Sequence, residues 1–279
     1  MGWLTVPFEP EFMQRALLAG TLAAVASAVI GTWVVVRGLA FIGDALAHGV
    51  VPGIAVAVLG GFSPAIGAMA SALVLAGGVS LISRRARVRD DTAIGLWFVG
   101  MLALGVVIVS RSDSFATDLT TLLFGDVLGA TGADLRLQLA ATAVVVLGCA
   151  VLHRAFVALA FDDRKAASLG LRPGASHLAM LVLVAVAIVA AFQAVGALLV
   201  FALLVGPPAT ATLLVRRLVG VMAVAVLLGV ASVAGGLVLS YHHGTAAGAT
   251  IAGTTVVVFL ATLAATEVAA SVRAHRPPT

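Results

Sequence analysis

Charged residues are scarce in this sequence. Only 10% of its 279 residues are Asp, Glu, Lys or Arg, whereas 62% are hydrophobic. An ordinary soluble domain carries about 25% charged and about 45–50% apolar residues. With so few charges, the chain has too little polar material to cover a water-facing surface of this size. This composition excludes a soluble globular enzyme, a disordered protein and a nucleic-acid-binding module, and it indicates a polytopic membrane protein.

Cysteine, lysine and aromatic residues are rare as well. Cys149 is the only cysteine, so the chain can form neither an internal disulfide framework nor a cysteine-rich zinc site. Lys165 is the only lysine, and the other 15 basic residues are Arg, gathered in short clusters between apolar runs. Such clusters are typical of positive-inside topology signals rather than of a nucleic-acid partner. Aromatic residues make up 6% of the chain and glycine numbers 30, which favours close helix packing.

The charge-free stretches predict the membrane-spanning helices, because a span requires about 20 apolar residues to cross about 30 Å of hydrocarbon. Nine apolar segments result: 16–36, 42–59, 63–82, 92–110, 137–152, two helices within 173–215 and two within 218–266. The sequence leaves open whether 42–59 crosses completely, and the N-terminus is outside with nine crossings but inside with eight. We therefore predict an all-α, polytopic transmembrane helical bundle with eight or nine membrane segments. It forms one domain over residues 1–279, with no soluble domain.

Asp44 is the most informative charge, because a carboxylate within an apolar segment is energetically costly and by default marks function. His48 follows four residues later, so the two side chains share one face if this stretch is helical. A carboxylate oxygen and an imidazole nitrogen suit a divalent cation such as Zn²⁺ or Mn²⁺. Two ligands hold an ion weakly, which suits a transport path. Spacing alone supports equally the alternative that Asp44 caps a helix beginning at Ala45 and that His48 is an interhelical donor.

Two further groups of residues are candidates for a transport path. His242 and His243, in SYHHGTAAG, lie on a turn between the last two spans and could pass a metal ion inward; the alternative is that they are ordinary polar residues at a helix end. Pro52 is expected to end the helix that carries His48. Pro207 and Pro208 remove two successive backbone N–H donors, so we expect a bend in their span that could serve gating.

The segment FDDRKAASLGLRPG, residues 161–174, connects two spans on the basic, cytoplasmic side. Asp162 or Asp163 can cap a short helix that Gly170 ends. A short amphipathic helix between two membrane helices has a shape that can press into a groove on a partner; the alternative is an ordinary connecting loop. The candidate contact residues are Phe161, Asp162, Asp163, Arg164, Lys165, Ala166, Leu169 and Gly170.

Five stretches occur in a specific order: GDALAHGVVPGIAVA, LLFGDVLG, FDDRKAASLGL, VGALLVFALLVGPPATATLL and GTAAGATIA. Together they resemble the integral-membrane permease of bacterial ABC importers for zinc and manganese, often called the ABC-3 metal-uptake family, over nearly the whole chain. The resemblance implies that Asp44 and His48 form a metal site in the transport path. It also implies that residues 161–171 dock a cytoplasmic ATP-binding subunit and that an extracytoplasmic metal-binding protein delivers the ion.

The function that this resemblance implies is the permease subunit of an ATP-driven importer in the cytoplasmic membrane. The permease is expected to work as a homodimer in membrane lipid, with Zn²⁺ or Mn²⁺ as its transported ion and no permanently bound cofactor. Zinc is favoured because His48, His242 and His243 supply imidazole. The chain itself is not expected to be an enzyme, because it has no GxxxxGK[ST] phosphate loop. The alternatives are a stand-alone ion-coupled metal carrier or channel, and a permease for a metal chelate of the siderophore or cobalamin type.

Overall fold

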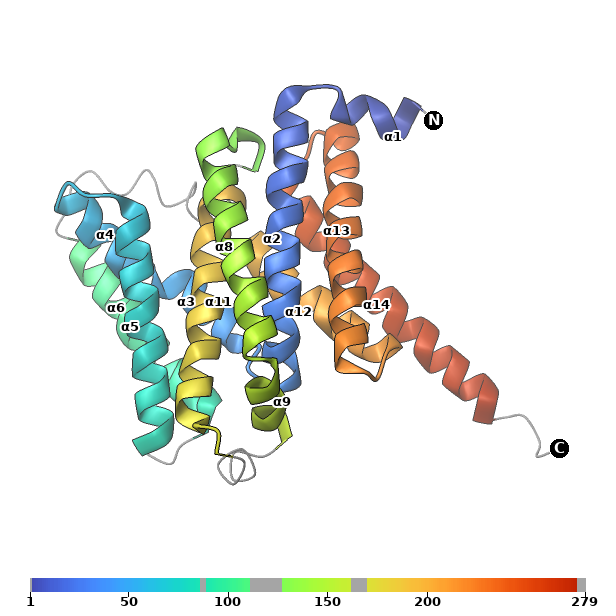
Figure 1. Cartoon of the computed structure of the whole chain (residues 1–279). Helices are drawn as coiled ribbons and strands as arrows, with labels where there is room; N and C mark the ends of the chain where they lie inside the picture. Colours follow the sequence, from blue (N-terminus) through green and yellow to red (C-terminus); the bar gives the residue numbers. More distant parts are fainter. Residues whose placement is uncertain (1, 86–88, 111–126, 162–169, 275–279) are drawn as a thin grey trace.

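The architecture is a bundle of long helices, and no strand occurs in the part of the chain that the structure describes (Figure 1). The structure is a computed structural model that describes residues 2–85, 89–110, 127–161 and 170–274. Its α-helices are α1 (Gly2–Thr5), α2 (Glu11–Val36), α3 (Phe41–Gly49), α4 (Val51–Leu59), α5 (Pro64–Arg85), α6 (Asp90–Val109), α8 (Gly132–Val151), α9 (His153–Phe161), α11 (Pro173–Val195), α12 (Ala197–Leu214), α13 (Leu218–His243) and α14 (Ala247–Ala274). Two 3₁₀ turns, η1 (Val6–Phe8) and η2 (Val127–Gly129), complete the described elements.

Nine of the described helical stretches are long and apolar enough to cross a membrane, judged by length and composition. Eight are single helices, and the ninth is the 19-residue stretch Phe41–Leu59, which α3 and α4 form together. Figure 1 shows the two termini at opposite ends of the bundle, as an odd number of crossings requires. The predicted all-α membrane bundle is confirmed, and of the two predicted numbers of crossings the structure favours nine.

The distribution of arginine agrees with this arrangement. Because successive spans alternate in direction, the ends of α2, α5 and α12 lie on the same side as the starts of α6, α11 and α13. Seven described basic residues occur at or next to these helix ends: Arg37, Arg84, Arg85, Arg89, Arg172, Arg216 and Arg217. The positive-inside rule assigns a side enriched in arginine to the cytoplasm. The rule therefore predicts a cytoplasmic C-terminus and an N-terminus on the opposite side.

Small residues let the helices pack closely around α2, which contacts α8, α11, α12 and α13. A Cβ atom on Gly31 of α2 would collide with the backbone carbonyl oxygen of Leu204 on α12. Pro208 has no N–H to donate to that carbonyl, which lies four residues earlier in the chain. α12 nevertheless continues through both Pro207 and Pro208, which are buried. The predicted bend at these prolines stays a prediction.

The span that carries the candidate metal ligands is broken near its middle. α3 ends at Gly49 and α4 begins at Val51, so Pro52 lies in the first turn of α4, where its missing N–H needs no partner. The hydroxyl of Ser71 on α5 donates a 2.7 Å hydrogen bond to the carbonyl of Gly49 at the end of α3. The helix therefore ends before Pro52 as the sequence suggests, but a second helix continues the crossing immediately.

α4 is held against α5 by direct contact between backbones. A Cβ atom on Gly53 would collide with the carbonyl oxygen of Gly67, and a Cβ atom on Gly67 would collide with that of Gly53. Only a residue without a side chain fits at either position. This contact fixes α4, the second half of the broken span, against α5. α3 packs mainly against α6, α12 and α11, and α4 also contacts α6.

Candidate metal site

Asp44 and His48 lie one helical turn apart on α3. Asp44 Oδ1 is 3.4 Å from His48 Nδ1, and each side chain is about one-third exposed. α3 begins at Phe41 with Ala40 as its N-cap, so Asp44 lies inside the helix rather than at its N-cap. The alternative interpretation, in which Asp44 caps a helix beginning at Ala45, is therefore wrong.

The hydrogen bonding of His48 leaves one ring nitrogen available to a metal ion. His48 Nδ1 lies 3.1 Å from the backbone carbonyl oxygen of Asp44. A carbonyl oxygen can only accept, so Nδ1 carries the proton and donates in this contact. In the neutral ring, Nε2 then has the lone pair that a metal requires. Such a bond from the other ring nitrogen is the usual way in which a metal-binding imidazole is oriented.

An aromatic ring lies against one side of the imidazole. The ring of Phe98, on α6, meets His48 edge-on, with centroids 6.2 Å apart, and meets Phe41 in the same manner at 5.8 Å. These contacts limit the rotation of the His48 side chain and place apolar surface beside it. The sequence did not indicate a role for Phe98, since nothing in its local pattern relates it to a histidine 50 residues earlier.

The opposite face of α3 is packed against the rest of the bundle. Ile42 and Leu46 are fully buried, and a Cβ atom on Gly43 would lie 2.6 Å from Leu204 Cδ2 of α12. α3 therefore has one apolar, buried face and one face that presents a carboxylate and an imidazole. A partly exposed ligand pair on a well-packed helix can contact an ion without rearrangement of the helix itself.

The two histidines at the end of α13 lie apart from this pair. His242 stacks on the ring of Trp3 with centroids 4.4 Å apart, and its Nε2 is 2.9 Å from the Trp3 carbonyl oxygen. His243 Nδ1 is 2.9 Å from the carbonyl oxygen of Leu239. Among the described residues, no group of three or more His, Cys, Asp or Glu side chains is placed to hold a metal ion. A role for His242 and His243 in metal entry stays a prediction.

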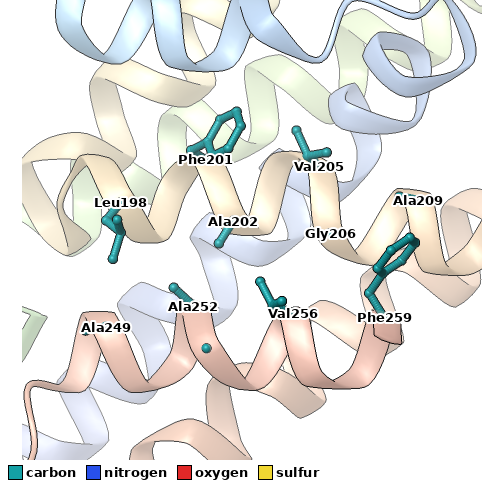
Figure 2. A pocket seen from close by; sticks show the side chains of 11 residues that line it. Leu198, Phe201, Ala202, Val205, Gly206, Ala209, Ala249, Ala252, Val256 and Phe259 are labelled. Carbon is teal, nitrogen blue, oxygen red and sulfur yellow. The ribbon is translucent and has the colours of Figure 1, made fainter. Parts of the chain in front are cut away.

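Two grooves on the bundle offer no metal ligands. Figure 2 shows the first, of about 430 Å³, between α12 and α14; hydrocarbon side chains such as Phe201, Val256 and Phe259 line it. The second, of about 550 Å³, lies between α5, α8 and α11 and is lined only by alanine, leucine, isoleucine, valine and methionine side chains. Apolar grooves on membrane-spanning helices cannot replace the hydration shell of a cation.

The predicted ATPase-contacting segment falls mainly outside the described residues, which omit 162–169. The backbone on either side is described. α9 ends at Phe161, and Gly170 has a left-handed backbone conformation, with φ of 74°, shortly before α11 begins at Pro173. Residues Asp162, Asp163, Arg164, Lys165, Ala166 and Leu169 therefore remain sequence-based candidates.

Comparison with known proteins decides the family. The model of the ABC 3 transport family matches residues 9–266, which is almost the whole chain. The chain belongs to this family. The resemblance drawn from the ordered sequence motifs is thus confirmed, and the chain is a multi-pass membrane permease of the ABC 3 type.

Three relatives of this ABC 3 permease illustrate the family. A protein named "Probable iron transport system membrane protein", from Haemophilus influenzae, is 35% identical over 249 residues, covering 89% of this chain and 92% of that one. The manganese transport system membrane protein MntC of Listeria monocytogenes is 34% identical, covering 89% of both chains. A solved structure of PsaBC from Streptococcus pneumoniae in complex with Fab is similar at a TM-score of 0.80 and 28% identity, covering 93% of this chain and 94% of that chain.

Proposed function

We propose that this ABC 3 permease is the membrane subunit of an ATP-driven importer that moves a divalent transition-metal ion across the cytoplasmic membrane. The observation that carries the proposal is the Asp44–His48 pair on one face of α3: the Asp44 carboxylate lies beside the imidazole, with Oδ1 3.4 Å from Nδ1, and the other ring nitrogen, Nε2, is left for an ion. The names of the relatives add support, because one is called a manganese and another a probable iron transport protein.

We place manganese ahead of zinc as the transported ion. The preference for zinc rested on three imidazoles, but His242 and His243 contact Trp3 and Leu239 instead. One imidazole and one carboxylate per chain suit manganese and ferrous iron as well as zinc, so the donor set no longer favours zinc. The manganese transport names among the relatives then support manganese.

A second copy of the chain would complete the ion site. Two ligands from one chain leave a divalent cation with several open coordination positions. Asp44 and His48 are each about one-third exposed, so a twofold-related copy could bring the same pair to the same ion. Four protein ligands would result, two carboxylates and two imidazoles. The homodimer of permeases is part of this proposal.

Two other subunits belong to the proposed importer. The sequence carries no GxxxxGK[ST] phosphate loop, so a separate cytoplasmic ATP-binding subunit is required, and we assign residues 161–174 to its contact. An extracytoplasmic metal-binding protein would deliver the ion on the side that holds the N-terminus and the α13–α14 turn.

Uptake of radioactive manganese by cells that lack their own importers tests the proposal. Asp44→Asn and His48→Gln should each lower uptake about tenfold or more at equal membrane abundance, because removing even a supporting group of a metal site costs about 10–100-fold. Glu267→Gln, which alters an exposed carboxylate on α14, is the matched control and should transport normally. Undiminished uptake in both site variants would remove the pair from the mechanism.

The same assay separates the alternatives. Competition with unlabelled zinc and iron ranks the ions, and His243→Gln tests metal entry through the α13–α14 turn. Manganese uptake by the chain alone in liposomes, without ATP or an ATP-binding subunit, would instead support an ion-coupled carrier. Uptake only in the presence of a chelator would support a chelate permease.

A further inference from the structure

Arg37 occupies the tight connection between α2 and α3, four residues before the helix that carries Asp44 and His48. It is the C-cap residue of α2, and its backbone N–H donates to the carbonyl of Trp33. Gly38 follows in a left-handed conformation with φ of 70°, and Leu39 N–H donates to the Val34 carbonyl at 2.9 Å. This turn is fixed by its own backbone hydrogen bonds, so the side chain of Arg37 projects from a rigid position.

The guanidinium group contacts two other helices. Nη1 donates a 3.2 Å hydrogen bond to the backbone carbonyl of Leu159, in the last turn of α9. Nη2 lies 3.7 Å from Asp90 Oδ2, at the start of α6, and the Arg37 side chain is only 12% exposed. The Arg37 cation lies at the C-terminal, carbonyl end of α9, and the Asp90 carboxylate lies at the N-terminal, amide end of α6. Each charge therefore interacts favourably with the dipole of its helix.

These helices lead to the two working parts of the proposed importer. α9 ends at Phe161, directly before the segment that we assign to the ATP-binding subunit. α6 carries Phe98, whose ring contacts His48. α3 itself begins at Phe41. The guanidinium group of Arg37 therefore contacts α9, which leads to the ATPase-contacting segment, and α6, which packs against His48.

A second contact ties α9 to α2 one turn away. Trp33, which is fully buried, meets the rings of His153 and Phe156 of α9 edge-on, each with centroids 5.4 Å apart. α9 is therefore attached to the end of α2 both by aromatic packing and by the Arg37 hydrogen bond. If α9 moves, these contacts should move the α2–α3 turn with it.

We infer that Arg37 is a positioning residue that couples movement of the ATPase-contacting segment to α3, which bears the metal pair, and to α6, which packs against it. The inference rests on the proposed function. Arg37 does not touch the ion. It acts by keeping α9 and α6 in fixed positions relative to the α2–α3 turn. Loss of its side chain should therefore let ATP be hydrolysed with less ion imported per ATP, while the binding of the ion stays unchanged.

The test uses the permease assembled with its ATP-binding subunit in proteoliposomes, with ATP hydrolysis and manganese import measured on the same preparation. Arg37→Ala should raise the number of ATP molecules hydrolysed per imported ion about threefold or more. Arg37→Lys keeps the charge and one donor and should give an intermediate ratio. Manganese binding by the Arg37→Ala complex should match that of the wild type, because Asp44 and His48 are unchanged.

Two further variants keep the test decisive. Asp90→Asn preserves the bond from Arg37 to Leu159 and should raise the number of ATP molecules hydrolysed per imported ion less than Arg37→Ala does. If the Arg37→Ala permease does not assemble with its ATP-binding subunit, Asp90→Asn replaces it in the test. Arg15→Ala is the matched control, since this exposed arginine pairs with Glu11 of its own helix and should leave the ratio unchanged.

The outcomes distinguish this inference from the proposed function. A wild-type complex that hydrolyses ATP without importing metal overturns the proposed function and the inference with it. A wild-type complex that imports manganese, together with an unchanged ratio in assembled Arg37→Ala or, failing its assembly, in Asp90→Asn, overturns the inference alone. A loss of manganese binding in Arg37→Ala would also overturn it, because the residue would then shape the ion site directly.

Discussion

The contact between Gly31 and Leu204 gives a quantitative prediction for Gly31→Ala. The added methyl group would collide with the Leu204 backbone carbonyl oxygen, and no side-chain rotation can relieve the collision. Contacts of a Cβ atom closer than 3.0 Å are essentially never observed, so α2 and α12 must separate by about 1 Å or more. Leu204 also supports α3 at Gly43, so the separation reaches the helix that carries the metal pair.

The energetic cost follows from this displacement. A gap of 0.5–1 Å forfeits roughly a quarter to a half of each dispersion contact across an interface. Overpacking a well-packed core typically costs about 1–3 kcal/mol, and the upper end applies here because the obstructing atom belongs to the backbone. At about 2–4 °C per kcal/mol, the apparent midpoint of thermal unfolding should fall by about 6–12 °C.

Scanning fluorimetry of the purified permease in detergent, at one scan rate, measures this shift. Gly77→Ala is the matched control, since its Cβ atom would meet nothing within 4 Å. Alanine is a better helix former than glycine by about 1 kcal/mol, so the control should be as stable as the wild type or slightly more stable. A Gly31→Ala midpoint within about 2 °C of the control would refute the packing argument, because such a shift corresponds to a change in the free energy of unfolding of about 1 kcal/mol or less.

Three other predictions concern helix capping, the burial of Cys149 and topology. Thr131 and Asp134 form a capping box at the start of α8, so Thr131→Ala should lower stability by about 1 kcal/mol in the same thermal assay, whereas Thr131→Ser should not. Cys149 is 4% exposed, so a maleimide should not label it before denaturation. In a Cys149→Ala background, a membrane-impermeant maleimide should label Glu9→Cys in intact cells, but Arg216→Cys only after permeabilisation; the reverse pattern would invert the topology.

The sequence predicted the helical bundle well because span length is a one-dimensional property. Charge-free runs compared with the thickness of a bilayer suffice to locate the helices, and the i,i+4 spacing placed Asp44 and His48 on one face. Only the 42–59 stretch was left open, and the immediate start of α4 at Val51 after α3 explains why it can cross.

Contacts between distant parts of the chain could not be predicted in this way. The bond from Arg37 to Leu159 joins residues 122 positions apart, and that from His242 to Trp3 joins residues 239 apart. Neither contact leaves a periodic pattern, because each depends on how whole helices are placed. The zinc preference rested on assuming that three histidines act together, and the Trp3 contact of His242 does not support that assumption.

The backbone contact between α4 and α5 limits how this permease can recover from mutation. A smaller residue at position 75 should suppress Gly49→Ala, because the obstructing atom there is the end of the Leu75 side chain. Gly53→Ala has no such remedy at residue 67, which is already glycine and obstructs through its carbonyl group. Selection for revertants of Gly53→Ala should therefore return the original codon rather than a compensating change at its neighbour.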